Sequence, residues 1–286
     1  MEGREVTHRL RAEGLTLAYE QRTVIRELDV AIPDGSFTVI VGPNACGKST
    51  LLRGLARMIR PAAGTVTLDE RPITAYGPKE VARRVALLPQ SPTAPDGITV
   101  LDLVARGRYP HQSLLRQWSV ADEEAVREAM AATGVADLAE RDVAQLSGGQ
   151  RQRVWIAMVL AQQTPLLLLD EPTTFLDIAF QLDVLDLCAD LHAGGERTLV
   201  AVLHDLNQAC RYATHLIAMR EGTILAQGPP GEIVDAALVR DVFGITCEVV
   251  PDPQTGTPMI VPAGRETRRR RREAARAEDP VAASRP

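Results

Sequence analysis

The chain has 286 residues with a formal net charge of −5, and 45% of its residues are hydrophobic. That hydrophobic fraction is typical of globular proteins and excludes intrinsic disorder over most of the length, which corresponds to one large or two small domains. No apolar run reaches the ~18 residues that a membrane-spanning helix needs, and residues 1–10 lack the apolar region of a signal peptide. The sequence therefore predicts a cytosolic protein, for which another chain would have to provide any membrane span.

Cysteine and aromatic usage excludes two further classes of protein. The four cysteines (Cys46, Cys188, Cys210 and Cys247) lie far apart and form no C-x-x-C pair. This pattern indicates neither a zinc site nor a disulfide framework. Aromatic residues make up only 3% of a chain with net negative charge, which argues against nucleic acid as a partner.

The first predicted elements are a strand, a glycine-rich turn and a helix. Residues 36–41 (SFTVIV) form a short apolar run, which predicts a buried strand. From Lys48 onward, apolar residues recur at helical spacing until Pro61 ends the helix. A second strand is predicted at 84–88.

The middle of the chain changes character. Residues 99–144 have no strand signal, and helical patterns occur at 100–106 and 122–133. This stretch predicts a helical insert, followed by a helix that continues through about residue 162.

The elements that follow alternate between strand and helix. Four leucines at 166–169, followed by turn residues, predict a strand that is buried on both faces. A helix is predicted at about 180–192, and residues 198–203 predict another buried strand that ends at His204. Such alternation predicts a parallel sheet.

Residues 265–286 form an arginine-rich tail. It holds eight arginines against four acidic residues, a charge of +4, so the other 264 residues carry −9. Without apolar periodicity, the tail is predicted to be disordered. It is either simply solvated or loosely attracted to an anionic membrane leaflet, where each arginine could add ~1 kcal/mol.

The segment Gly42-x-x-x-x-Gly47-Lys48-Ser49 has the pattern of a phosphate-binding loop. In such a loop, backbone N–H groups and the positive end of the following helix face a phosphate. Lys48 would reach the β- and γ-phosphates, and Ser49 would offer its hydroxyl to Mg²⁺. The alternative, an ordinary glycine-rich turn, does not explain why a strand precedes the segment and a helix follows it. It also leaves unexplained why Lys48 is one of only two lysines in the chain.

Two acidic residues end the leucine strand. Asp170 and Glu171 would lie at the carboxyl end of a parallel strand, where ligands bind in such sheets. One acid could hold Mg²⁺ and the other could polarise an attacking water, since adjacent strand residues point in opposite directions. Pro172 disfavours helical geometry at Glu171. The alternative is that one acid only caps the next helix.

The pentapeptide LSGGQ, at 146–150, distinguishes between classes of phosphate-loop protein. Ser147 and Gln150 have the spacing of a capping box, and two glycines allow a ligand to approach the backbone. By itself this is only a capped helix. It lies 99 residues after Lys48 and 23 residues before Asp170, and this combination is specific.

From about residue 10 to residue 264, the chain resembles the ATP-binding subunits of ABC transporters. The resemblance implies an α/β fold, with a P-loop NTPase (RecA-like) core, an N-terminal antiparallel β subdomain and an α-helical subdomain inserted at about 99–147. It implies one ABC ATPase domain at 1–264, followed by the disordered tail at 265–286.

The resemblance also implies ATP and Mg²⁺ as ligands and gives roles to residues. Tyr19 is at the position of the aromatic that stacks on adenine. Gln90 is in the loop that senses Mg²⁺ and contacts the membrane subunits. The implied catalytic residues are Glu171, the switch histidine His204, and Gln90. The implied metal-binding residues are Ser49, Gln90 and Asp170. The other implied nucleotide-binding residues are Gly42, Pro43, Asn44, Ala45, Cys46, Gly47, Lys48, Ser49, Thr50, Ser147, Gly148, Gly149, Gln150 and Asp177. A lone histidine at a strand end would otherwise be structural.

In this family, two ATP-binding subunits form a head-to-tail dimer. Each ATP would lie between residues 42–50 of one protomer and 147–150 of the other, with Asp177 in the loop that crosses the interface. The implied partners are membrane permease subunits, contacted through the helical subdomain and the Gln90 loop, and indirectly an extracytoplasmic siderophore-binding protein. The implied location is the cytoplasmic face of the cell membrane, as a peripheral subunit.

Three stretches, 105–111, 171–181 and 203–234, are similar to ferric-siderophore importers. Cobalamin and haem importers share much of this pattern and remain alternatives for the cargo. A soluble ABC ATPase with a regulatory or assembly role is the alternative from a different class. A P-loop GTPase or kinase is excluded, because the chain has LSGGQ and no N-K-x-D motif.

Two residues of the phosphate loop lead to specific expectations. Ala45 stands where relatives often have glycine, so its φ is expected to stay negative. Cys46 lies beside a helix N-terminus and Lys48, surroundings that lower the pKa of a thiol. Alkylation of Cys46 is therefore expected to inhibit the protein, and MgATP to protect it. The alternative for Cys46 is an inert core residue.

Overall fold

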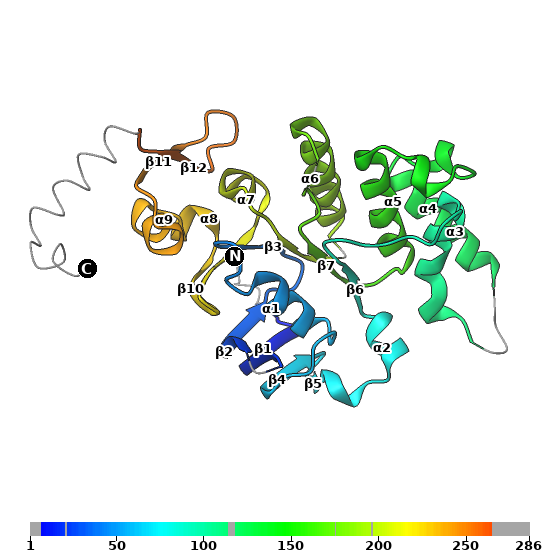
Figure 1. Cartoon of the computed structure of the whole chain (residues 1–286), viewed down its shortest axis with the longest axis horizontal. Coiled ribbons are helices and arrows are strands. Elements are labelled where there is room, and N and C mark those ends of the chain that lie inside the picture. The colour runs from blue at the N-terminus through cyan, green and yellow to red at the C-terminus, as the bar shows by residue number, and fades with distance from the viewer. Residues whose placement is uncertain (1–6, 21, 114–117, 175, 196, 265–286) are drawn as a thin grey trace, which may run out of the picture.

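The computed structural model describes residues 7–264 except 21, 114–117, 175 and 196. At its centre is a six-stranded sheet in the order β10-β9-β3-β8-β7-β6 (Figure 1). Strands β9, β3, β8, β7 and β6 run parallel, as predicted, and β10 pairs antiparallel with β9. The strands are β3 (Phe37–Val41), β6 (Val85–Leu88), β7 (Leu166–Asp170), β8 (Thr198–Val202), β9 (His215–Arg220) and β10 (Thr223–Gly228).

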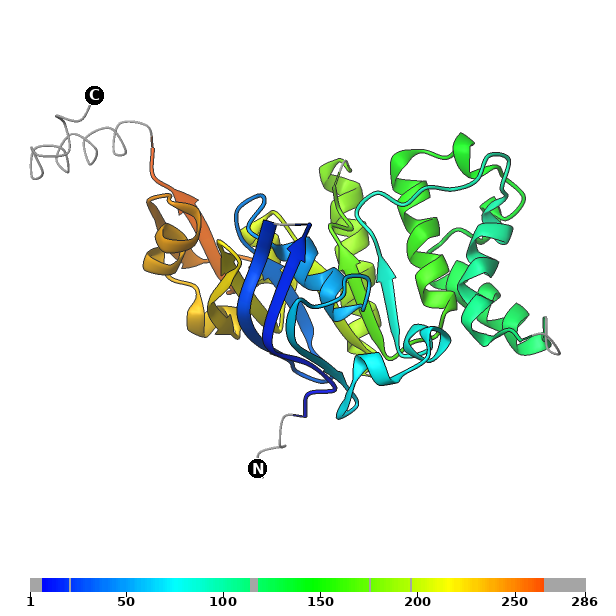
Figure 2. The same ribbon diagram turned by 60° about the horizontal axis from the view of Figure 1, so that its bottom comes forward.

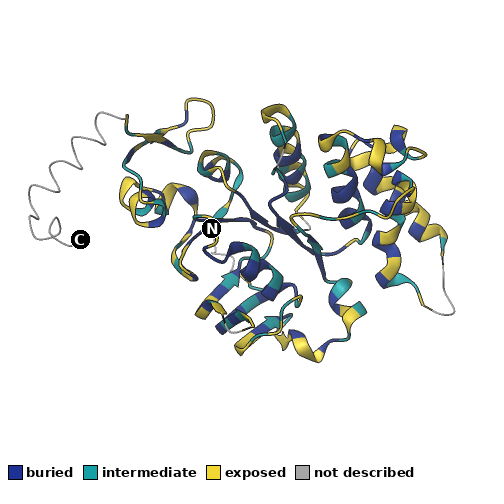
Figure 3. Cartoon of the chain, viewed as in Figure 1, coloured by how far each residue is buried: buried dark blue, intermediate teal, exposed yellow. Residues whose placement is uncertain are grey.

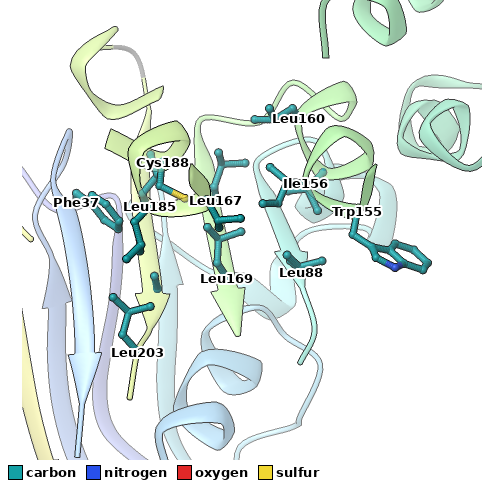
Figure 4. Packing of buried hydrophobic residues seen from close by; sticks show 14 of the residues in the cluster. Phe37, Leu88, Trp155, Ile156, Leu160, Leu167, Leu169, Leu185, Cys188 and Leu203 are labelled. Atoms are coloured by element: carbon teal, nitrogen blue, oxygen red, sulfur yellow. The ribbon is translucent and has the colours of Figure 1, made fainter. Parts of the chain in front are cut away.

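Strand β7 shows why a run of four leucines is stable here. Leu166 and Leu168 point into a core that the central sheet shares with the N-terminal strands, whereas Leu167 and Leu169 point into the core on the opposite face. Figure 4 shows Leu167 and Leu169 on the same face as Leu185 and Ile156. Each fully buried leucine contributes about 2 kcal/mol of transfer free energy. The strand is therefore buried on both faces, as predicted.

The N-terminal residues form a separate antiparallel sheet in the order β2-β1-β4-β5. Its strands are β1 (Leu10–Tyr19), β2 (Arg22–Ile32), β4 (Ala63–Leu68) and β5 (Arg71–Pro72). Figure 2 brings the blue strands of this sheet to the front of the molecule. Together with the helix α1 (Lys48–Leu55), the sheet forms the second core of the molecule against one face of the central sheet.

A group of helices lies beyond the β6 edge of the central sheet (Figure 1). It contains α3 (Val100–Ala105), a 3₁₀ segment (Arg106–His111), α4 (Val120–Ala132), 3₁₀ turns at Ala136–Leu138 and Val143–Gln145, and α5 (Gly148–Ala161). The two ends of the insert meet, because Val100 N–H donates to the Arg141 carbonyl and Val143 N–H to the Ile98 carbonyl, both at 3.0 Å. Inside the insert, the buried Arg108 pairs with Asp122 at 2.8 Å.

The rest of the chain completes the core. A 3₁₀ turn (Ile73–Ala75) and α2 (Pro78–Ala82) precede β6, and α6 (Ile178–Ala193) lies between β7 and β8. After β8 come α7 (Leu206–Tyr212), α8 (Pro230–Ile233), α9 (Ala236–Phe243) and a hairpin of β11 (Cys247–Pro251) and β12 (Pro258–Pro262). Figure 3 shows β3, β7 and β8 buried along their whole length, whereas β10 and the outer helices have exposed faces.

Two further predictions concern membrane-spanning helices and the C-terminal tail. None of the helices in the described ranges is both long and apolar enough to cross a membrane. The predicted disordered tail, 265–286, lies outside the described residues.

Candidate nucleotide-binding and hydrolysis site

The phosphate loop links β3 to α1, as predicted. Gly42 has a φ of 154°, and a Cβ atom at this position would lie 2.2 Å from the Met219 carbonyl oxygen, so only glycine fits. Gly47, with a φ of 108°, is the N-cap of α1. The Lys48 ammonium is folded back on the loop and donates to the Gly42 and Pro43 carbonyls, both at 2.9 Å. Lys48 is only 4% exposed, so the loop encloses its charge.

Ala45 departs from the expectation for this loop. Its φ is 61°, in the left-handed region, rather than negative. A non-glycine residue in this conformation costs about 1–2 kcal/mol. The expectation was wrong because the path of the loop around Lys48 determines the backbone here, whatever residue occupies it. Such strain is common where a backbone is shaped to bind a ligand.

Cys46 also differs from its expectation. The residue is 5% exposed and belongs to the core beneath the N-terminal sheet. Burial raises the pKa of its thiol, and the nearby charge of Lys48 offsets this effect only in part. The expected lowering of the thiol pKa is therefore wrong, because desolvation outweighs the positive charges around the loop.

We therefore expect Cys46 to react slowly with iodoacetamide at pH 7. The reaction rate should rise with pH, because only the thiolate reacts, and MgATP should slow it further by holding the loop closed. Mass spectrometry of the labelled protein over time would measure this, with Cys46→Ser as the control. Burial also raises the pKa of Cys188 and Cys210 to about 12, so these thiols should label even later. Labelling of Cys46 at the rate of a free cysteine would contradict the prediction.

Asp170 ends β7 and faces the start of α1. Its carboxylate, in a residue only 1% exposed, accepts a hydrogen bond from the Ser49 hydroxyl at 2.6 Å and pairs with Arg53 at 3.4 Å. Burial raises the pKa of Asp170, and the Ser49 and Arg53 contacts oppose the shift. A hydroxyl and a carboxylate in direct contact are hard oxygen ligands, and this pair fits Mg²⁺.

Glu171 has an unusual backbone and a crowded carboxylate. Its φ is 56°, so the residue before Pro172 is not right-handed helical, as the sequence predicts. Its Oε2 accepts hydrogen bonds from Gln90 Nε2 at 2.6 Å and from the Thr174 hydroxyl at 3.0 Å, and lies 2.8 Å from His204 Nε2. Burial alone would raise the pKa of Glu171, but the contacts with His204, Thr174 and Gln90 outweigh it and lower the pKa. The carboxylate is therefore ionised at neutral pH.

One cavity of about 830 Å³ unites most of the predicted site residues. Tyr19, 43% exposed, lies at its edge, and Glu171 and His204 line it together with the phosphate loop. Its lining residues are Tyr19, Arg22, Thr23, Val24, Asn44, Ala45, Gly47, Lys48, Ser49, Thr50, Gln90, Glu171, His204, Glu221 and Gly222. A nucleotide-sized opening thus contains an ammonium, a helix N-terminus and an ionised carboxylate.

The LSGGQ segment and Asp177 are not among the lining residues of this cavity. Ser147 and Gln150 form the predicted capping box of α5: the Gln150 N–H donates to the Ser147 hydroxyl and the Ser147 N–H to the Gln150 side chain. Asp177 caps α6 by accepting from the Phe180 N–H at 3.0 Å. Within a single protomer Ser147, Gln150 and Asp177 therefore act as helix caps. Leu146 is buried in the core, and Phe180 leaves no room for a side chain at Gly149.

The sequence analysis missed the polar lining residues Arg22, Thr23 and Glu221, and it also missed two polar partners of the site carboxylates. Arg53 reaches Asp170, and its position one helical turn after Ser49 could have indicated this. Thr174 reaches Glu171 from three residues further along the chain, within a turn that Pro172 begins. A hydroxyl at this spacing after an acidic residue is the signal that could have found it.

A phosphate loop after a central parallel strand, with a buried acid and a second carboxylate at the end of β7, the next strand but one in the sheet, is the arrangement of a P-loop nucleoside triphosphatase. The family model for "ABC transporter" matches residues 25–174. The chain belongs to this family, as an ATP-binding subunit, and the predicted fold is confirmed.

Similar proteins support this assignment. The chain is 59% identical to the ferric enterobactin transport ATP-binding protein FepC of Escherichia coli (strain K12), over 91% of this chain and 96% of FepC. It is 53% identical to the petrobactin import ATP-binding protein FpuD of Bacillus anthracis, over 94% and 98% of the two chains. Its fold is similar to the dimeric structure of MJ0796, a bacterial ABC transporter cassette, with a TM-score of 0.68 and 25% identity over 77% of this chain and 98% of the other.

Proposed function

We propose that this chain hydrolyses ATP, with Mg²⁺, to power the import of a ferric siderophore through a separate membrane permease. The convergence of Gln90, Thr174 and His204 on the Glu171 carboxylate, inside the cavity of the phosphate loop, supports the hydrolysis. The 59% identity to the ferric enterobactin transport protein, over nearly the whole of both chains, supports the cargo. The subunit would lie on the cytoplasmic face of the cell membrane.

In this proposal, ATP lies along the cavity from Tyr19 to Glu171. The Tyr19 ring stacks on adenine at the open edge, and the N–H groups of residues 42–50 surround the phosphates. Lys48 turns from the Gly42 and Pro43 carbonyls toward the β- and γ-phosphates, because phosphate oxygens are better acceptors for an ammonium than carbonyls.

Ser49 and Asp170 would hold Mg²⁺, with Gln90 completing the set from its loop. When bound, the ion neutralises charge that develops on the phosphate oxygens. Glu171, ionised and adjacent to Asp170, accepts a proton from the attacking water. His204 holds the γ-phosphate end of the cavity closed.

The proposal of a dimer rests on the absence of residues 147–150 and Asp177 from the lining of the cavity. Residues 147–150 lie outside the cavity of their own protomer, yet their helix N-terminus is suited to a phosphate. In a head-to-tail dimer, this segment of the partner and Asp177 would close the cavity of the first protomer. The domain would comprise residues 1–264, and its helical insert, with the Gln90 loop, would dock on the permease and so reach the extracytoplasmic siderophore-binding protein indirectly.

We expect wild-type protein to restore uptake of radiolabelled ferric enterobactin in a strain that lacks its own copy of this subunit but retains the permease. Glu171→Gln should not restore uptake, because transport needs hydrolysis. Labelled cobalamin and haem are measured in parallel. Restored uptake of cobalamin or haem in place of ferric enterobactin would overturn the assignment of a ferric siderophore as the cargo. If uptake of none of the three labelled compounds is restored although the purified chain hydrolyses ATP, the proposed role in transport is contradicted.

A further inference from the structure

The Glu171 carboxylate has three partners on one oxygen. Gln90, His204 and Thr174 all contact Oε2, at 2.6, 2.8 and 3.0 Å. Among the described residues, Oε1 has no hydrogen-bond partner. An ionised carboxylate held by one oxygen leaves the other free to accept the proton of a water, so the contacts decide which oxygen acts as the base.

The three partners belong to different parts of the chain. Gln90 follows β6 and His204 follows β8, both far from Glu171 in sequence. Thr174 belongs to the same turn as Glu171, and its N–H also donates to the Glu171 carbonyl, at 3.3 Å. The hydroxyl and the backbone N–H of Thr174 thus both contact Glu171 from within the same turn. The contacts of Gln90 and His204 depend instead on the positions of the loops after β6 and β8.

The proposed mechanism requires the two distant partners to change their contacts. In that mechanism Gln90 turns its amide oxygen toward Mg²⁺ and His204 turns toward the γ-phosphate, and both movements draw the side chains away from Oε2. When they do so, the Thr174 hydroxyl is the contact that stays, because it moves with Glu171. The hydrogen bond from Thr174 would then be the contact that keeps Oε1 directed into the cavity.

We infer that Thr174 is a positioning residue for the general base: its hydroxyl fixes the Glu171 carboxylate during hydrolysis, after Gln90 and His204 have moved to the nucleotide. This inference rests on the proposed ATP hydrolysis and adds a residue to it.

The test uses Thr174→Val, which keeps the side-chain shape and removes the hydroxyl. We expect its kcat for ATP hydrolysis to fall roughly 10- to 100-fold, the effect of losing a hydrogen bond to a charged group, while KM stays within about 2-fold of wild type. Thr174→Ser restores the hydroxyl and should recover most of the kcat. Thr174→Ala serves if the valine variant does not fold. Thermal unfolding shows whether each variant is folded at the assay temperature.

Thr173→Val is the matched control. Thr173 is the neighbouring, similarly half-buried threonine, and its hydroxyl has no hydrogen bond among the described residues. It should hydrolyse ATP like wild type. A second measurement, the ATP-dependent dimer seen by size-exclusion chromatography, should show more dimer for Thr174→Val, because slow hydrolysis leaves ATP bound.

Three results would overturn the inference: a kcat of Thr174→Val within about 2-fold of wild type, a Thr174→Ser variant as slow as Thr174→Val, or an equal loss in Thr173→Val. A wild-type protein that hydrolyses no ATP would instead overturn the proposed function. The two failures are therefore distinguishable.

Discussion

Glu171→Gln is expected to bind ATP with wild-type affinity and to hydrolyse it roughly 100- to 10,000-fold more slowly, the usual contribution of a general base. Glutamine has nearly the same shape as glutamate and can still contact Gln90, His204 and Thr174, but its amide cannot take a proton from water. Because ATP remains intact, the dimer should accumulate. Release of phosphate under single-turnover conditions, together with size-exclusion chromatography, would measure both effects.

The control for this variant is Glu232→Gln, which makes the same chemical change at an exposed position on α8. It should hydrolyse ATP at the wild-type rate. If Glu171→Gln retains near wild-type turnover, Glu171 is not the base. Its three contacts would then be structural, and the base would have to come from elsewhere in the cavity.

Lys48→Ala should weaken MgATP binding by about 30-fold or more, because removing one partner of a buried charged contact costs about 2–5 kcal/mol. The enclosed Lys48 ammonium is surrounded by loop carbonyls that are poor substitutes for phosphate oxygens, so the nucleotide competes for it successfully. Isothermal titration calorimetry with a non-hydrolysable ATP analogue would give the affinity directly.

Lys79→Ala is an informative comparison, since Lys48 and Lys79 are the only lysines in the sequence. The Lys79 ammonium lies 4.5 Å from the centre of the Tyr109 ring and donates to the Gln112 carbonyl, outside the cavity of the phosphate loop. Its removal should leave the affinity unchanged. Undiminished affinity in Lys48→Ala would refute the role proposed for this residue.

The sequence predicts best those elements whose signals are local. The strand of four leucines and the helical insert come from periodicity and turn residues, and the structure has them within a few residues of the predicted ends. The helix after the phosphate loop begins at Lys48 as predicted but ends at Leu55 rather than at Pro61, because the backbone turns left-handed at Arg57, with a φ of 60°. The N-terminal antiparallel sheet followed only from the resemblance to a family. The hairpin of β11 and β12 was not predicted, since its short strands have no strong pattern.

The site was predicted less evenly, for physical reasons. Motif spacing predicted Lys48 and Glu171 at the site, and the family resemblance added His204. All three line one cavity, because the ends of neighbouring parallel strands meet there. The thiol of Cys46 was misjudged because its pKa depends on how deeply the loop packs against a sheet formed by other residues. The backbone of Ala45 was misjudged for a similar reason: loop geometry is set by the whole turn.

The order of strands in the central sheet has a consequence for how the protein is made. Strand β3, which leads into the phosphate loop, lies between β8 and β9, so Phe37 pairs with Leu199 and Val41 with Ala218. These partners leave the ribosome long after the loop itself, and contacts so distant in sequence form late in folding. The nascent chain therefore contains the sequence of the phosphate loop well before the strands that hold β3 in the central sheet have been synthesised. The backbone partners of β3 are complete only once the chain has been synthesised past β9, so we expect a nascent chain that ends before β9 to bind no nucleotide.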